Sequence, residues 1–301
     1  MNIKEENKKV YISDLEDFSL QQTLECGQCF NFEKINDEKD EYVVIAMNRL
    51  LHISQENDNI IFHNITTEDI NLWVKYFDLD RDYGVIKKTL VENAPELKKA
   101  IEDKWGVRIL NQEFNETLMS FIISQNKQIP HIKQIVRMLS ENYGRHIGSI
   151  NGKDYYSFPD VLALSNIGIE GYQKCKTGFR AKYLADASEK LKSGLNAQSF
   201  ENLEYEEALS LLKEIKGVGD KVANCVLLFS LGYRSAFPVD VWIKRAMEDV
   251  YFKKETPNTE IMEFAKERFG IYGGYAQQYL FYHIRGDGKW QISSNVKKLW
   301  N

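Results

Sequence analysis

A lysine and an aspartate in the last third of the chain have the types and spacing for chemistry at a sugar carbon. Lys221 closely follows the turn Gly217-Val218-Gly219, and Asp240 lies 19 residues after the lysine. The stretch Val222–Phe229 is so apolar that it predicts a buried helix. Burial and the positive end of a helix both favour the neutral amine, a nucleophile that can form a Schiff base. The alternative is a lysine that reaches solvent or only touches a phosphate.

The turn before the lysine suits an anion. Gly217 and Gly219 separate a short apolar helix, residues 211–215, from the helix of Lys221, and glycine permits positive φ and close approach of another backbone. The start of the second helix then offers free N–H groups, which bind anions such as DNA phosphates. The alternative is an ordinary helix–turn–helix connection in a core, because a Gly-x-Gly turn alone is a weak signal.

Asp240 has two compatible interpretations. It follows Pro238-Val239 and precedes a helical pattern that begins at Val241, so it is a natural N-cap. A carboxylate fixed there could also stabilise a cationic transition state at a sugar carbon.

Length and composition predict a globular protein. The chain has 301 residues, 43% of them hydrophobic, which is enough for two or more domains and a large core. No stretch approaches the roughly 18 apolar residues of a membrane span, and the N-terminus MNIKEENKKV has no apolar signal region. We therefore expect a cytoplasmic protein, associated with the nucleoid in a prokaryote, and no membrane partner.

The overall charge counts against a nucleic-acid binder, but its distribution does not. The net charge is −5. Residues 1–97 hold 10 Lys and Arg against 20 Asp and Glu, whereas residues 98–301 hold 29 against 24. A DNA-binding face is therefore expected on the second part, with salt-dependent binding.

The four cysteines do not predict a metal site. Cys26 and Cys29 form a C-x-x-C pair, but a zinc site needs two further ligands, and Cys175 and Cys225 lack suitable pairing. No βαβ setting for a redox motif is visible either. We expect no metal and no other cofactor.

The pattern along the chain predicts a sheet followed by helices. Residues 10–97 contain short β-rich runs and two helical stretches, 67–76 and 85–91. The β-rich runs are 29–32, 42–47, 50–53 and 60–63. The remainder is a series of amphipathic helices, which we place at 113–123, 129–141, 158–164, 180–193, 205–215, 221–229, 241–250, 259–269 and 274–283. We predict two domains, 1–97 and 98–301, the second with a hairpin at 211–229.

These features together resemble the helix-hairpin-helix superfamily of DNA glycosylases, and within it the 8-oxoguanine DNA glycosylases. The likeness runs from about Cys26 to Phe281. It rests on the hairpin, Lys221, Asp240 and six segments: ECGQCFNF (25–32), YFDLD (76–80), GVRIL (106–110), FIISQN (121–126), GFRAKY (178–183) and AQQYLF (276–281). The resemblance implies an α+β protein, with an N-terminal antiparallel β-sheet domain packed on a mostly α-helical HhH-GPD glycosylase domain.

The resemblance also implies a role for each matching residue. Lys221 attacks the anomeric carbon and Asp240 stabilises the developing charge. Gly27 places its carbonyl opposite N7 of a flipped base, and Gln277 bonds the Watson–Crick edge. The base is held between Cys225 and Phe281. The implied partner is double-stranded DNA that contains 8-oxoguanine, bound by a monomer.

Several residues are implied in contacts with DNA outside the base pocket. Asn126 and Arg180 serve the orphaned cytosine, and Phe179 wedges into the base stack. Gly217 and Gly219 present the hairpin to a phosphate.

Three positions depart from the family pattern. His131 stands where an arginine reads the cytosine, Phe179 replaces a tyrosine, and Trp242 replaces a histidine. Because histidine lacks the fixed bidentate fork of arginine, we predict more tolerance of other bases opposite the lesion.

Two other functions stay open on the sequence. One is a sibling glycosylase for another damaged base, such as an alkylated purine. The other is a non-catalytic hairpin module that only clamps DNA.

Overall fold

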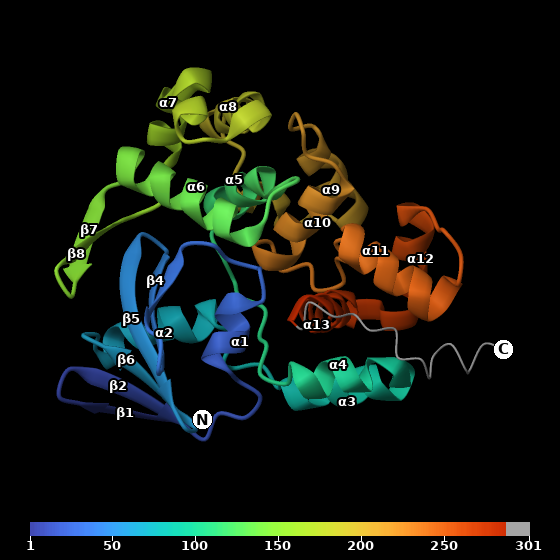
Figure 1. Cartoon of the computed structure of the whole chain (residues 1–301), viewed down its shortest axis with the longest axis horizontal. Coiled ribbons are helices and arrows are strands. Elements are labelled where there is room, and N and C mark those ends of the chain that lie inside the picture. Colours follow the sequence, from blue (N-terminus) through green and yellow to red (C-terminus); the bar gives the residue numbers. More distant parts are fainter. Residues whose placement is uncertain (287–301) are drawn as a thin grey trace.

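The computed structural model describes residues 1–286, in which a six-stranded antiparallel sheet precedes a group of helices (Figure 1). The strand order is β1-β2-β6-β5-β4-β3. A tight two-residue turn joins β4 to β5: Met47 and Asn48 both have φ of 54°, and the flanking residues Ala46 and Arg49 pair. The strands are β1 (Asn2–Glu6), β2 (Lys9–Ser13), β3 (Phe32–Asn36), β4 (Asp40–Ala46), β5 (Arg49–Glu56) and β6 (Asn59–His63).

One face of the sheet is covered by two helices, α1 (Leu20–Glu25) and α2 (Thr67–Tyr76). Leu24 of α1 and Trp73 of α2 share a buried cluster with Phe62 and other inward-facing strand residues. Because α1 is fixed in this way, the loop that follows it, which carries Gly27, starts from a rigid support.

The rest of the chain is mostly helical. Its largest buried cluster runs from α3 to α13 and is separate from the cluster under the sheet. The helices are α3 (Tyr83–Asn93), α4 (Lys98–Asp103), α5 (Phe114–Ser124), α6 (Ile129–Tyr143), α7 (Val161–Lys174), α8 (Ala181–Lys192), α9 (Tyr205–Lys213), α10 (Asp220–Phe229), α11 (Val241–Met247), α12 (Asn258–Phe269) and α13 (Gly273–Gly286).

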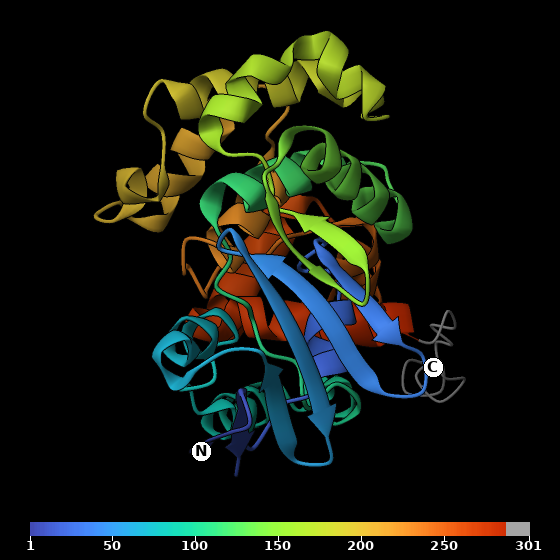
Figure 2. The ribbon, with the colours of Figure 1, turned by 90° about the vertical axis from the view of Figure 1, so that its left-hand side faces the viewer.

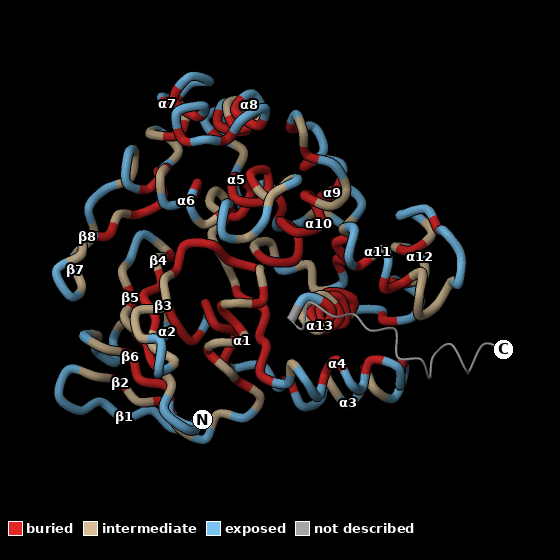
Figure 3. Tube along the Cα trace, in the orientation of Figure 1, coloured by how far each residue is buried: buried red, intermediate tan, exposed pale blue. Residues whose placement is uncertain are grey.

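Three helices form the centre of this part. In α10 every residue from Val222 to Phe229 is buried, which confirms the predicted buried helix. Figure 3 shows the same heavy burial along α5 and α13, whereas α7 and α12 have long exposed edges. Side chains at the ends of α5, α10 and α13 therefore project from fixed positions.

A small hairpin links the two parts of the molecule. It consists of β7 (His146–Ile150) and β8 (Lys153–Tyr156), and it lies beside the six-stranded sheet in Figure 2. Lys153 forms an ion pair with Glu33 of β3. This hairpin was not predicted, because its two short strands carry no sustained alternation of apolar residues.

The predicted fold class is confirmed, with corrections in detail. The strand predicted at 29–32 is wrong: β3 begins at Phe32. The helix predicted at 158–164 is displaced, because Asp160 caps α7 with its carboxylate on the N–H of Ala163; α7 then continues to Lys174 with a break at Gly168, whose φ is 65°. The division at residue 97 stays a prediction, and residues 287–301 of the second predicted domain lie outside the described part of the chain.

Candidate active site

The glycine turn joins α9 to α10 as the sequence predicts. Gly217 has φ of +80°, and a Cβ there would lie 2.4 Å from the ring of Tyr183 on α8, so only glycine fits. Gly219 is the N-cap of α10, and a Cβ on it would meet no atom within 4 Å. The first N–H groups of α10 are therefore approachable from outside, which is the geometry an anion needs.

Lys221 lies in the first turn of α10 and reaches toward the end of α5. Its Nζ donates to Ser124 Oγ at 3.1 Å and lies 5.1 Å from the centre of the Phe121 ring. The side chain is half-buried and lines a cavity of about 380 Å³. Lys221 therefore does not project into bulk solvent, which was the principal alternative.

Asp240 lines the same cavity and caps α11. Its Oδ1 accepts hydrogen bonds from the backbone N–H groups of Trp242, at 3.0 Å, and Ile243, at 2.8 Å. The predicted N-cap is confirmed. These two bonds hold the carboxylate still, and its position on the wall of the lysine's cavity allows it to act on a charge that develops there.

The same cavity is lined by the four residues to which the family resemblance gives a role in binding the base: Gly27, Cys225, Gln277 and Phe281. It is built from the loop after α1, the end of α5, the start of α6, α10, the segment before α11, and α13. The cavity is lined by Gly27, Phe30, Phe121, Ser124, Lys127, Gln128, Ile129, Pro130, Ile132, Lys221, Cys225, Phe229, Pro238, Asp240, Trp242, Gln277, Gln278, Phe281 and Arg285.

The two amide atoms of Gln277 differ in their hydrogen bonding within residues 1–286. Its Nε2 donates to the carbonyl of Pro238 at 3.2 Å, which fixes the side chain. Its Oε1 is buried and accepts no hydrogen bond from any residue between 1 and 286. A buried acceptor without a donor costs free energy, so this oxygen is suited to a ligand that brings an N–H group.

Gly27 approaches the cavity where a side chain would obstruct it. Its φ is +89°, and an added Cβ would lie 2.9 Å from Ile129 Cδ1 and 3.3 Å from Phe281 Cε1. The next residue, Gln28, is buried, and its Nε2 donates to the carbonyls of Thr23 and Arg108 at 2.8 and 2.7 Å. The loop is thus a rigid turn as well as part of the cavity wall.

Cys225 and Phe281 supply apolar surface to the cavity. Burial raises the pKa of the Cys225 thiol to about 11, while the positive charge of Lys221 opposes the shift. The thiol is therefore neutral at physiological pH and behaves as a small apolar group. Phe281 is half-buried on α13. The arrangement suits a flat aromatic ligand.

The residues implied in contacts with DNA differ in accessibility. Phe179 is 53% exposed and Trp242 is 45% exposed. Asn126, in a left-handed conformation after α5, and His131 are exposed as well. Arg180 is only 4% exposed: its guanidinium donates to the carbonyl of Gln125, through Nε at 2.8 Å, and to that of Thr177. It supports the loop of Asn126, and its contact with an orphaned base stays a prediction.

Sequence reasoning missed three residues of the cavity that matter for its chemistry. Ser124 accepts from the lysine, Phe30 adds apolar surface, and Arg285 lies at the end of α13. Arg285 had a usable signal, because it follows Phe281 by four residues and helical side chains at that spacing share a face.

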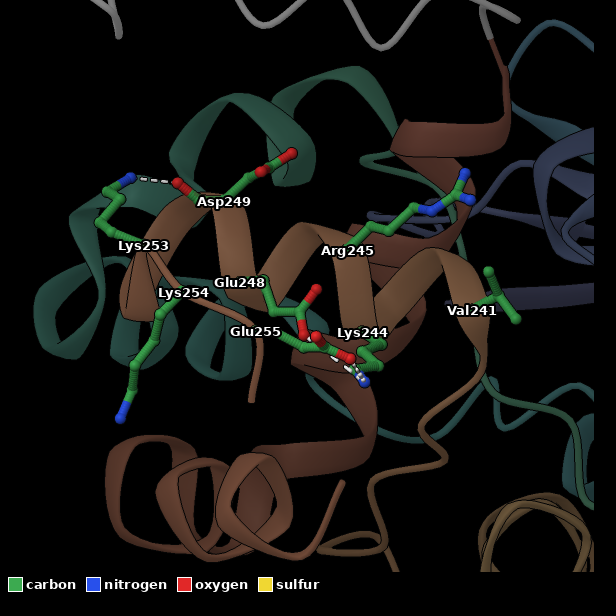
Figure 4. Close-up of a pocket in the computed structure, with 8 residues that line it drawn as sticks. All are labelled: Val241, Lys244, Arg245, Glu248, Asp249, Lys253, Lys254 and Glu255. Carbon is green, nitrogen blue, oxygen red and sulfur yellow. Dashed lines mark hydrogen bonds and ion pairs between the residues drawn. The ribbon is translucent and has the colours of Figure 1, made fainter. Parts of the chain in front are cut away.

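A second hollow, of about 630 Å³, lies along the exposed side of α11 and the segment after it (Figure 4). Lys244 is already paired there: its Nζ lies 3.6 Å from Glu248 and 3.8 Å from Glu255. Figure 4 shows Arg245 pointing away from these pairs. Among the described residues 1–286, the lining of the hollow includes no cysteine or glutamine and a single apolar residue, Val241, so it lacks the apolar walls of the first cavity.

The fold and the first cavity define a class of protein. Residues 119–270, about half of the chain, match the HhH-GPD superfamily of base excision DNA repair proteins, and residues 10–118 match the N-terminal domain of 8-oxoguanine DNA glycosylase. The chain belongs to the HhH-GPD superfamily, and within it to the 8-oxoguanine DNA glycosylases.

Similar proteins match this chain over most of its length. A structure of MBOgg1 in complex with a low-affinity DNA ligand has 43% identity and a TM-score of 0.91, and the match covers 96% of this chain and 99% of that one. The 8-oxoguanine glycosylase/lyase of Clostridium acetobutylicum, in complex with double-stranded DNA containing cytosine opposite 8-oxoguanine, has 39% identity, a TM-score of 0.91 and the same coverage. The N-glycosylase/DNA lyase of Saccharomyces cerevisiae is 29% identical over 93% of this chain and 87% of its own length.

Proposed function

We propose that this protein removes 8-oxoguanine from double-stranded DNA and then cleaves the strand at the same sugar. The observation that carries the proposal is that Lys221 and Asp240 line one cavity together with Gly27 and the Oε1 of Gln277, which has no hydrogen-bond partner among residues 1–286. The names of the similar proteins support the same activity. The reaction begins when a base is flipped into the cavity, which costs a few kcal/mol and is easier for a damaged base.

One hydrogen atom, the one on N7, would distinguish the oxidised base from guanine in this cavity. Oxidised guanine carries N7–H, a donor, whereas guanine has a lone pair at N7. The carbonyl of Gly27 would accept from the first and repel the second, and an unmet buried polar group costs about 1–3 kcal/mol. Gln277 Oε1 would accept from an N–H on the Watson–Crick edge, while Cys225 and Phe281 hold the faces of the ring.

The chemistry uses two ionisable side chains of the cavity, Lys221 and Asp240. Once it has given up its proton, the amine of Lys221 forms a bond to C1′ as the bond from C1′ to N9 of the base breaks, and the electron pair leaves with the base. The fixed carboxylate of Asp240 stabilises the positive charge that develops on the sugar. The nitrogen bonded to C1′ then gives up a proton to the ring oxygen O4′ as the bond from C1′ to O4′ breaks, which leaves a protonated Schiff base. The excised base takes a proton from C2′, and the electron pair of that bond expels the 3′ phosphate by β-elimination.

The DNA would lie across the helical part of the molecule. The open N–H groups of α10 would take a phosphate, and exposed Phe179 would enter the base stack at the position of the flipped nucleotide. Residues 98–301 carry the excess of positive charge that such binding needs. We keep the cytoplasmic location and the monomeric state as proposals. Within residues 1–286, no helix has the length and apolarity to cross a membrane.

One assay tests the proposed function. A duplex with a single 8-oxoguanine is incubated with the protein, and strand scission is followed next to the same duplex with guanine. Borohydride should trap the protein covalently on the damaged duplex only. If the damaged duplex is left intact while a duplex with an alkylated purine loses its base, the alternative glycosylase is the correct function.

The opposite-base hypothesis is tested with four duplexes that place C, A, G or T opposite the lesion. Because exposed His131 stands where an arginine is expected, we expect the four excision rates to lie within about tenfold of one another. A hundredfold preference for cytosine would refute the hypothesis.

A further inference from the structure

Arg285 is a charged residue of the base cavity that has no role in the reaction proposed above. It lies in the last turn of α13, one helical turn after Phe281, and it lines the cavity. Its side chain is exposed overall, but its guanidinium carbon lies 5.3 Å from the centre of the Phe281 ring. Arg285 thus places a cation at the rim of an otherwise largely apolar site.

The guanidinium lies next to Gly27. A Cβ built on Gly27 would be 3.4 Å from Nη1 of Arg285, about as close as it would be to the Phe281 ring. Burial lowers the pKa of the Arg285 guanidinium and the charge of Asp240 opposes this shift, so the guanidinium is within electrostatic reach of that carboxylate. The cation, the Gly27 loop and the stacking ring therefore meet at one edge of the cavity.

A bound base would present acceptor oxygens to that edge of the cavity. If the Gly27 carbonyl accepts N7–H, the two oxygens that flank N7 on an 8-oxopurine, O6 and O8, lie on the same side of the base. Both oxygens are acceptors, and Arg285 has five N–H donors. When the bond from C1′ to N9 breaks, the electron pair stays on the base, which becomes an anion with charge spread onto these oxygens.

We propose that Arg285 is a base-binding residue that donates to the oxygen-bearing edge of the flipped base and stabilises it as a leaving anion. The proposal rests on the proposed function. In the reaction, Lys221 Nζ bonds to C1′, the bond from C1′ to N9 breaks, and the base departs with that electron pair beside the Arg285 cation. The guanidinium keeps its proton throughout. The flexible, exposed side chain moves from the Phe281 ring to the base edge when the base enters.

The proposal separates the two steps of the reaction. Excision has the base in the cavity, whereas cleavage of a preformed abasic site has none. Arg285→Gln should therefore lower the single-turnover excision rate on an 8-oxoguanine duplex by about 10-fold to 100-fold, the range for a hydrogen bond to a charged group. Cleavage of an abasic-site duplex should stay within about twofold. Arg285→Lys, which keeps the charge without the planar fork, should retain more excision than Arg285→Gln.

Lys104→Gln is a matched control. Lys104 Nζ lies 4.7 Å from the ring centre of Tyr282, the residue after Phe281, so the control removes a cation that contacts the same helix outside the cavity. It should change neither rate. Equal losses of excision and abasic-site cleavage in Arg285→Gln would overturn the proposal, because they indicate a contact with the DNA backbone or with the fold. No loss of excision, or the same loss in the control, would overturn it as well.

The two proposals fail in different ways. If the wild-type protein leaves 8-oxoguanine in place but cleaves an abasic site, the proposed substrate is wrong. If the wild type excises 8-oxoguanine and Arg285→Gln excises it equally fast, only the role of Arg285 is wrong.

Discussion

The base cavity and the hollow along α11 are lined by adjacent residues, Asp240 and Val241 respectively, yet they differ in how their charged side chains are paired. The hollow is larger, about 630 Å³ against 380 Å³. One of its lysines, Lys244, faces two carboxylates across open surface, where ion pairs contribute little. In the cavity, Asp240 is held by two backbone N–H groups and Lys221 by a hydroxyl, so neither charge is cancelled by the group that positions it.

Charged side chains that are held in place without an ion-pair partner therefore identify the active site better than the volume of a hollow does. A charge held by neutral partners keeps its field for the reacting atoms and needs no reorganisation during the reaction. A charge already paired at the surface has no such field to offer. Substitutions that exchange or remove these features test the comparison.

The largest effect is expected from the two lysines. Lys221→Gln should lower strand cleavage by about a thousandfold or more and abolish borohydride trapping, because the nucleophile is gone. Lys244→Gln, in the hollow, should stay within about twofold, because it removes only a surface ion pair. Gel assays of scission and trapping measure both variants. Equal trapping by Lys221→Gln would show that another amine attacks.

Asp240→Asn separates the two functions of one side chain. Asparagine caps helices as well as aspartate does, so the free energy of unfolding should change by less than about 1 kcal/mol. The excision rate should fall about 100-fold to 1,000-fold, because the fixed negative charge is lost. Thermal unfolding and single-turnover kinetics measure the two quantities. Full excision activity of the Asp240→Asn variant would leave capping as the only role of this side chain.

A pair of glycines distinguishes backbone strain from obstruction of the cavity. Gly27 and Gly152 have φ of +89° and +77°, but a Cβ on Gly152 would meet nothing within 4 Å. Gly27→Ala and Gly152→Ala should each lose about 1–2 kcal/mol of stability from the left-handed backbone. Only Gly27→Ala should also slow excision, by about 10-fold to 100-fold, because it displaces Ile129 and Phe281. Equal activity of the two variants would contradict the placement of Gly27 in the site.

Local signals in the sequence were sufficient for the parts of the molecule that follow from short-range physics. The glycine turn, the buried helix after it and the cap at Asp240 all depend on residues within a few positions of one another. The cavity required more, because Gly27 and Phe281 lie at opposite ends of the chain. Only the resemblance to a known family brought them together on the sequence.

Other features had no local signal. The β7–β8 hairpin is held by Gly148 against Leu50 and by the Lys153–Glu33 pair, which are contacts between distant segments. Arginine is a residue type typical of exposed DNA contacts, yet the guanidinium of Arg180 donates to the carbonyl of Gln125 inside the protein. Which partner a guanidinium takes is decided by tertiary packing.

Glu116 is an acid with a raised pKa that does not line the base cavity, and we expect it to have no catalytic role. Burial, and next the charge of Glu113, raise the pKa of the Glu116 carboxyl to about 8, at the junction of the sheet and α5. The folded protein therefore keeps a proton that the unfolded chain loses above its ordinary pKa near 4.5. The stabilising contribution is complete below that value and is lost as the pH rises to about 8.

Glu116→Gln removes this dependence. We expect the variant to gain about 1–3 kcal/mol over the wild type between pH 5 and pH 8, with excision unchanged within about twofold. Urea unfolding at several pH values measures the first quantity and single-turnover kinetics the second. The same loss of stability with pH in the variant would assign the titration to another group, and a large loss of excision would mean that this acid belongs to the catalytic site after all. The expected result restricts catalysis to acids that line the base cavity, since a strongly raised pKa at Glu116 arises from burial between two packed layers and from a neighbouring carboxylate.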